Sequence, residues 1–162
     1  MIRNLLIVTG LLGIGLQIYY ASHLPAVVAS HFGVGGSPNG WMSNHANLLF
    51  GSGMIILISG IFLSVPLILR KAPVGLINFP KKSYWLAPAR REATIPRIAA
   101  WLGCMGIATN LFLLVMNHLV YQANLTMPAR LNEPAFLGLL AGYLVTVVAW
   151  LIALFVKFNR TA

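Results

Sequence analysis

Residues 48–69 have the sequence LLFGSGMIILISGIFLSVPLIL, which contains no charged side chain. A helix needs about 20 predominantly apolar residues to cross the roughly 30 Å hydrocarbon core of a bilayer. Three further uncharged, apolar stretches occur at residues 5–22, 98–120 and 135–156, and all the charged side chains of the chain lie outside the four stretches. The sequence therefore predicts four transmembrane helices.

The composition excludes an ordinary water-soluble domain. Of the 162 residues, 59% are hydrophobic and 8% are charged, whereas soluble domains contain about 25% charged residues. The loops are too short for a second folded domain, and helices are the structure that lipid favours because their backbone groups are paired internally. We predict a single all-α membrane domain over residues 1–162: a four-helix transmembrane bundle with a short extracytoplasmic β-hairpin-like loop between the first two helices.

The basic residues predict the orientation of these helices. Residues 70–97 contain seven of the eleven lysines and arginines, and further bases lie at both ends of the chain. Because loops rich in Lys and Arg stay in the cytoplasm, this loop and both termini are expected inside, and residues 23–47 and 121–132 outside. Arg3 precedes an apolar run, as in a signal peptide, but no small-x-small cleavage site follows, so we expect a retained first helix.

The formal net charge of +9 does not by itself indicate nucleic-acid binding. Such binding needs bases gathered on one accessible face together with a recognisable module, and the positive-inside rule already explains nearly all of these bases. Phe79, Tyr84 and Trp85 lie near Lys81 and Lys82, an arrangement typical of headgroup anchoring. We expect membrane lipids, and no nucleic acid, among the partners.

Small and polar side chains predict which helix faces meet, because helices in lipid associate through close backbone approach and polar contacts. The expected inward residues recur at helical spacing in three spans: Thr9, Gly13 and Gln17; Gly103, Gly106, Asn110, Asn117 and Tyr121; Gly138, Gly142, Thr146, Ala149 and Ala153. Gln17, Asn110, Asn117 and Tyr121 would form a polar bundle interior. The same amides, with His118, could instead line a path for a substrate or proton, and Gly138 with Gly142 could serve a homodimer.

The outer loop between the first two spans has the composition of a compact turn. Pro38 fixes one backbone dihedral and Asn39-Gly40 favours a positive one, so residues 30–32 are expected to pair with residues 40–42 across a turn at positions 37–40. Phe32 and Trp41 would rest at the membrane interface. Helix starts are expected at Ser43 or Asn44, at Thr94 with Pro96, and at Asn132 with Pro134.

A family resemblance rests on this loop, which carries the pattern LP-x-x-V-A-S-H-F followed by G-x-P-N-G-W-M-S directly after an apolar helix. The matching residues are Leu24, Pro25, His31, Phe32, Gly36, Pro38, Asn39, Gly40 and Trp41. The pattern resembles the DUF1648 domain over about residues 9–55, and residues 78–92 are similar to a segment of its small stand-alone members. Some relatives resemble the SdpI-type immunity and signalling proteins, which have additional spans. The resemblance implies a bacterial inner-membrane protein.

Three histidines of the outer side, His23, His31 and His45, are weak candidates for a zinc or copper site. Their spacing fits no metal motif, and no acid or cysteine lies in that loop to assist them, so interfacial or hydrogen-bonded imidazoles are the favoured interpretation and no cofactor is expected. Catalysis is not expected either. The two carboxylates, Glu92 and Glu133, are predicted on opposite sides of the membrane, and the serines have no evident His and Asp partners.

These observations predict a non-enzymatic membrane protein whose outer loop recognises a protein or peptide, in an immunity- or signalling-like role. The expected binding residues are His31, Phe32, Pro38, Asn39 and Trp41. The expected partner is another membrane protein, a peptide or a second copy of the chain. The alternatives are an accessory subunit of a larger membrane complex and a small permease or metal-handling protein.

Overall fold

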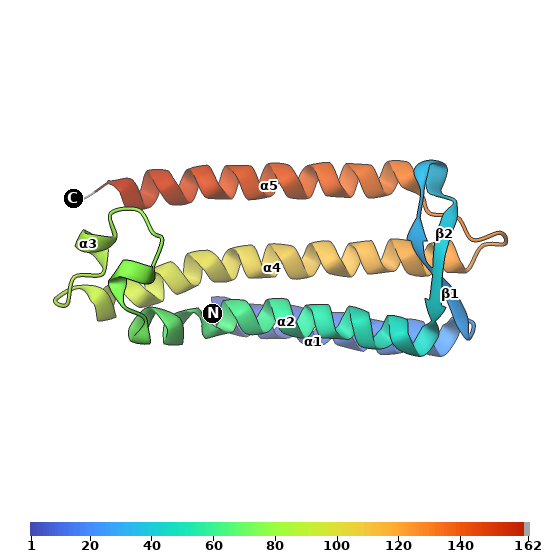
Figure 1. The fold of residues 1–162 in the computed structure, drawn as a ribbon, viewed down its shortest axis with the longest axis horizontal. Coiled ribbons are helices and arrows are strands. Elements are labelled where there is room, and N and C mark those ends of the chain that lie inside the picture. The colour runs from blue at the N-terminus through green and yellow to red at the C-terminus, as the bar shows by residue number, and fades with distance from the viewer. Residues whose placement is uncertain (161–162) are drawn as a thin grey trace.

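The computed structural model describes residues 1–160. Four long helices run side by side, as Figure 1 shows: α1 (Ile2–His23), α2 (Asn44–Lys71), α4 (Arg91–Asn124) and α5 (Glu133–Asn159). Each is long and apolar enough to cross a membrane. The predicted four-helix fold is confirmed, and every helix extends beyond the uncharged stretch that predicted it.

The helix ends follow local chemistry. Helix α1 stops one residue before Leu24, ahead of Pro25, and the Ser43 hydroxyl caps α2 by accepting from the Ala46 amide. The Asn132 side chain caps α5 by accepting from the Ala135 amide. The predicted starts of α2 and α5 are confirmed.

The start predicted for the third span is wrong. Helix α4 begins at Arg91, so both Thr94 and Pro96 lie inside it. Proline costs this helix one hydrogen bond, to the carbonyl four residues earlier. Ile95 and Ile98 on either side are almost fully buried, and their packing offsets that loss.

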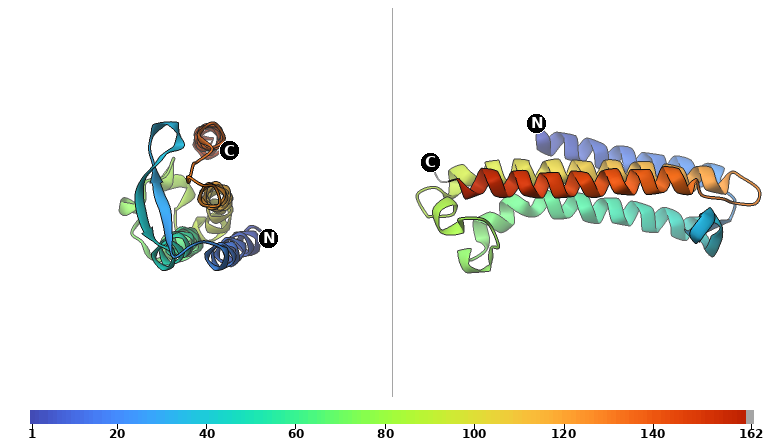
Figure 2. Two further views of the ribbon diagram at one scale, coloured as in Figure 1. Left: turned by 90° about the vertical axis from the view of Figure 1, so that its right-hand side faces the viewer. Right: turned by 90° about the horizontal axis from the view of Figure 1, so that it is seen from above.

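Helices α1, α2 and α4 pack against one another, whereas α5 packs chiefly against α4. Seen along the bundle in Figure 2, α5 lies beside α4 on the side away from α1 and α2. Much of the surface of α5 is therefore left open.

A two-stranded antiparallel hairpin crosses one end of the bundle (Figure 1), which is called the hairpin end below. Strand β1 (Val27–Phe32) pairs with β2 (Pro38–Ser43), with Val28 opposite Met42 and Ala29 opposite Trp41. The predicted hairpin between the first two helices is confirmed. The turn predicted at residues 37–40 is wrong, because those residues lie largely in β2 and the reversal is a 3₁₀ turn, η1 (Val34–Gly36).

Glycines decide where the chain reverses. Gly35 and Gly36 have φ angles of 79° and 74°, a region that glycine occupies without a steric penalty. Gly40, which the sequence predicted to have a positive φ, is an ordinary strand residue beside His31. Its lack of a side chain matters for a different reason, since an added Cβ would lie 2.9 Å from the His31 Cβ.

The opposite end, which holds most of the lysines and arginines and is called the basic end below, contains a buried hydrophobic cluster. The segment between α2 and α4 includes a 3₁₀ turn, η2 (Val74–Leu76), and a short helix, α3 (Lys82–Trp85). The segment folds against the ends of the long helices around a buried cluster made of Leu69, Leu86, Ile95, Ile98, Leu154 and Phe158. The Trp85 indole N–H donates to the Phe158 carbonyl at 2.7 Å. Trp85 thus helps to pack this end of the bundle.

The small-residue stripe of α5 does not face the bundle. Gly138, Gly142, Thr146, Ala149 and Ala153 are all exposed, so the prediction that they form the inward face is wrong. Large side chains make the contacts between α4 and α5 instead: Tyr143 stacks on Phe112 with ring centroids 4.4 Å apart, and the Trp150 indole donates to the Trp101 carbonyl. Gly138, Gly142 and Thr146 line an open groove beside these contacts. In contrast, Gly13, Gly103 and Gly106 on α1 and α4 are buried.

Candidate functional site

The hairpin is fixed to α4 by one side chain. In the last turn of α4, the Asn124 Oδ1 accepts from the Ala29 amide at 2.7 Å, and its Nδ2 donates to the Ala29 carbonyl at 3.0 Å. The amide group thus pairs with β1 as a neighbouring strand would. Val28 and Ala29 are completely buried, so these backbone groups have no water to replace Asn124.

The tip of the hairpin is fixed to the turn before α5. The Gly35 amide donates to the Glu133 carboxylate at 3.0 Å, and the Arg130 guanidinium donates to the Gly35 carbonyl at 3.3 Å. The Leu131 amide donates to the Gly36 carbonyl at 2.9 Å. Glu133 also lies in the first turn of α5, where a negative charge is stabilised by the helix dipole.

The base of the hairpin is fixed to the end of α1. The Asn44 side chain donates to the carbonyls of Ala21 and Leu24 at 2.8 and 3.2 Å, and its backbone amide donates to Ala26. The hairpin is therefore attached at its base, middle and tip. It is a docked element with a defined outer surface.

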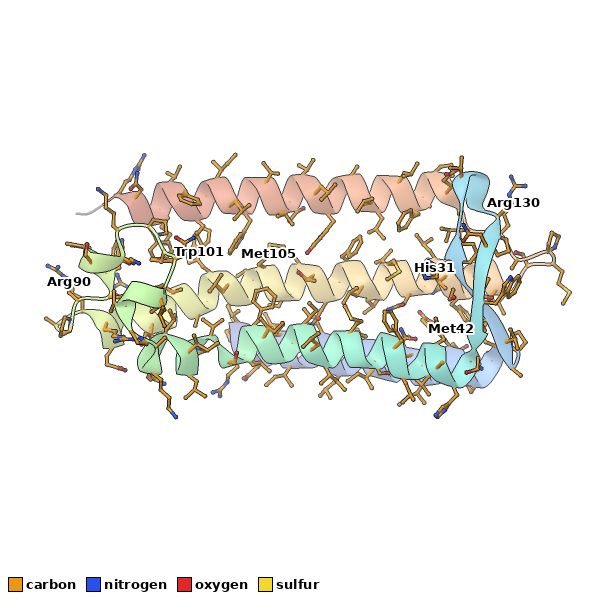
Figure 3. The ribbon with its side chains drawn as sticks, viewed as in Figure 1. His31, Met42, Arg90, Trp101, Met105 and Arg130 are labelled. Carbon is orange, nitrogen blue, oxygen red and sulfur yellow. The ribbon has the colours of Figure 1, made fainter. Side chains whose placement is uncertain are left out.

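The five predicted binding residues all lie on this hairpin. His31, Asn39 and Trp41 are exposed, and Phe32 and Pro38 are half-buried and pair across the strands. Figure 3 shows His31 and Met42 on the strands and Arg130 at the same end of the bundle. Further apolar side chains are exposed at this end: Val34 at the hairpin tip is 96% exposed, and Met127 in the turn between α4 and α5 is 100% exposed. The hairpin end therefore presents apolar and polar side chains together.

Sequence reasoning missed the residues that hold the hairpin. The contacts of Asn124, Arg130 and Glu133 with it join positions more than 90 residues apart, which no local pattern reveals. One signal was available for Glu133, because it is the only acidic residue predicted on the outer side. A single carboxylate on that side would be expected to have a specific donor.

An aromatic cluster below the hairpin was also missed. The Tyr20 hydroxyl shares a hydrogen bond with the His118 Nδ1 at 3.0 Å, and its ring stacks on Tyr121 with centroids 4.3 Å apart. Tyr20 is one helical turn beyond Gln17 on the buried face of α1. Extending the predicted stripe by one turn would have identified it.

The polar residues predicted inside the bundle occupy different environments. The Asn110 Nδ2 donates to the hydroxyls of Thr9 and Ser59 at 3.3 and 3.0 Å, which joins α4 to α1 and α2. Gln17 is 3% exposed and lies against Gly51, whereas Asn117 and Tyr121 are half-buried. Because an amide does not titrate, Asn110 can bind the helices together but cannot carry a proton.

His23, His31 and His45 are not brought together as a metal site. Over residues 1–160, the structure contains no group of three or more His, Cys, Asp or Glu side chains placed to hold an ion. His23 Nδ1 lies 2.8 Å from the Tyr19 carbonyl. His31 lies on β1 and His45 in the first turn of α2.

The two carboxylates lie at opposite ends of the bundle. Glu92 pairs with Arg70 at the basic end, with 3.2 Å between Nε and Oε2, and Glu133 binds the hairpin tip. They cannot act together as a general acid and base.

Comparison with known families identifies the first part of the chain. Residues 8–57 match the family model described as "Domain of unknown function (DUF1648)". This segment is a DUF1648 domain. The match extends one residue before and two residues beyond the limits predicted from the sequence. Neither the comparison with curated proteins nor that with solved structures gave a match.

The DUF1648 domain corresponds to a helix–hairpin–helix unit: most of α1, the whole hairpin and the first half of α2. The side chains of Asn124, Arg130 and Glu133 lie outside it. The second half of the chain therefore supplies the platform on which the hairpin of the domain is docked.

Proposed function

We propose that this chain is a non-enzymatic, multi-pass protein of a bacterial inner membrane whose hairpin end recognises another protein or peptide. In this proposal the basic end and both termini are cytoplasmic. The distribution of lysine and arginine supports this orientation, because one end of the bundle carries most of them. The hairpin then faces away from the cytoplasm.

The observation that carries the proposal is the docking of the hairpin backbone. Asn124 and Glu133 bind main-chain groups of β1 and η1, so the side chains of His31, Asn39 and Trp41 remain available. A surface that is already ordered loses little conformational entropy on binding. Tryptophan is also among the residues that contribute most binding energy at interfaces.

An immunity- or signalling-like role is the form of recognition that we propose, by likeness to the SdpI-type relatives of the DUF1648 domain. In such a role the partner is a peptide or membrane protein that reaches the outer surface. The exposed apolar residues Val34 and Met127 at the same end of the bundle as Trp41 support a partner with apolar side chains of its own.

An accessory subunit of a larger membrane complex is the second candidate, and the open surface of α5 favours it. Leu144, Val145, Val148 and Ile152 are all more than half exposed. In a bilayer such a face meets either lipid or another protein, so exposure alone does not separate the two functions. A permease role would rest on the polar residues of the bundle, Gln17, Asn110, Asn117 and His118, and a metal-handling role on the unclustered His23, His31 and His45.

Site-specific photo-crosslinking distinguishes the first two candidates. A benzophenone amino acid is placed at Asn39 or Trp41 on the hairpin and, as a control, at Val145 on α5, and adducts formed in living cells are analysed by mass spectrometry. We expect a discrete protein or peptide adduct from the hairpin positions and none from Val145. An adduct from Val145 alone would favour the subunit, and no protein adduct from the hairpin would contradict recognition.

A further inference from the structure

An apolar groove lies between α1, α2 and α4 near the basic end, far from the hairpin. It has a volume of about 310 Å³ and is lined by Arg3, Leu6, Phe62, Pro66, Pro96 and Gly103, among others. Leu6 at its base is 1% exposed. Arg3 is the charged side chain of this lining, since the other lining residues are apolar.

Two prolines shape the groove from opposite sides. Pro66 of α2 and Pro96 of α4 both line it. Because proline has no amide hydrogen, the carbonyls four residues earlier, at Phe62 and Glu92, lose their helical donor. The groove is thus apolar along its walls.

The groove is narrow where α4 meets α1. A Cβ at Gly103 would lie 2.7 Å from the Ile2 Cγ2, and Ala99 and Ala100 line the same side. Because the residues of α4 that line the groove have short side chains, they leave the groove unfilled between the three helices.

The mouth of the groove carries net positive charge. Arg3 is exposed there, and Arg70 lies one helical turn beyond Pro66 on the same side of α2. The Arg70 guanidinium pairs with Glu92 at 3.2 Å, and both side chains are more than half exposed. The pair is neutral in sum, so the unbalanced positive charge next to the apolar wall is that of Arg3 and of the α-amino group of Met1, which also lines the groove.

We propose that this groove binds an anionic phospholipid, with an acyl chain along Leu6, Phe62 and Gly103 and the phosphate at Arg3. Arg3 comes two residues before the uncharged stretch that begins the first span, and long basic side chains near the ends of membrane-spanning helices extend toward the headgroups. Guanidinium groups bind phosphate oxygens in a two-pronged geometry. A zwitterionic lipid carries its own cation and gains less from Arg3. The proposal concerns the opposite end of the molecule from the recognition hairpin and does not depend on it.

Lipid retention by the full chain tests the proposal. The protein is held in phosphatidylcholine nanodiscs, doped with phosphatidylglycerol of the same acyl chains, and bound lipids are counted by native mass spectrometry. We expect phosphatidylglycerol to be retained in preference to phosphatidylcholine. Arg3→Gln should weaken this retention by about fivefold, which is the contribution of one base near a membrane surface.

Two further variants test whether lipid retention depends on the groove and on Arg3 in particular. Lys71→Gln removes an exposed base from the same end that does not line the groove, and it should retain phosphatidylglycerol as the wild type does. Ala100→Phe should fill the groove and abolish retention with the helical circular dichroism unchanged. If Ala100→Phe fails to fold, the comparison of Arg3→Gln with Lys71→Gln still decides. Equal retention of the two lipids by the wild type, or equal retention by Arg3→Gln and Lys71→Gln, would overturn the proposal.

Discussion

Gly35 and Gly36 show how neighbouring residues with the same backbone conformation differ in what surrounds them. Both have positive φ angles. A Cβ on Gly35 would meet nothing within 4 Å, whereas a Cβ on Gly36 would collide with the carbonyl of Leu131. Gly36 is therefore required both by its own dihedral and by the contact between the hairpin and the turn before α5.

We expect Gly35→Ala to lower the stability by about 1 kcal/mol, the cost of a left-handed conformation for alanine. Gly36→Ala should cost clearly more, because the hairpin tip must also move away from Leu131. Thermal unfolding of both variants in the same detergent measures the difference. Equal losses would show that the tip is not docked as described.

Asn124 is the side chain with most influence on the position of β1. We expect Asn124→Ala to cost about 1–3 kcal/mol, because it leaves the buried amide and carbonyl of Ala29 unpaired. Hydrogen exchange at residues 27–32 should accelerate. Asn39→Ala, at an exposed position of β2, is the matched control and should change stability by less than about 0.5 kcal/mol. Unchanged exchange in Asn124→Ala would contradict the role given to this residue.

At the scale of single residues, the sequence predicted which positions gather on the hairpin but not the reasons. His31, Asn39 and Trp41 could be placed on one short loop because they are close in the chain. The docking by Asn124 could not be predicted, since it depends on how a helix end almost 100 residues later is positioned. Gly40 was expected to have a positive φ because Asn-Gly favours one. The strand pairing with β1 overrides that local preference.

For the helices, too, some features follow from the local sequence and others from tertiary packing. The existence and order of α1, α2, α4 and α5 follow from uncharged length, because lipid requires paired backbone groups wherever the chain crosses it. Which face turns inward depends on the neighbours. On α4 the glycines allow close contact with α1 and α2. On α5 the aromatic rings of Tyr143 and Trp150 make the contacts with α4, and the small residues are exposed.

Matched substitutions in α4 and α5 test this assignment of faces. Gly106→Leu should be destabilising by about 1–3 kcal/mol, because even a Cβ there would lie 2.7 Å from the Phe62 ring. Gly142→Leu should be nearly neutral, since an added Cβ meets nothing within 4 Å. The readout is unfolding in mixed micelles. A similar loss in Gly142→Leu would indicate that the α5 stripe contacts another chain.

For the whole molecule, the two ends of the bundle carry different structures. At the basic end, α3 and the adjacent loop complete a buried cluster around Phe158. At the other end, the hairpin of the DUF1648 domain rests on side chains from the second half of the chain. Between the two ends the helices expose mostly apolar residues, as expected for surfaces in lipid. In the proposed function the hairpin end lies outside the cytoplasm.

Cysteine accessibility measures that orientation directly. In a Cys104→Ser background, which removes the single cysteine of the chain, a cysteine is introduced by Val34→Cys at the hairpin tip or by Ser83→Cys in α3. Both positions are exposed. With a membrane-impermeant maleimide, Val34→Cys should be labelled in intact cells and Ser83→Cys only after permeabilisation. The reverse pattern would place the hairpin in the cytoplasm and contradict the proposed function.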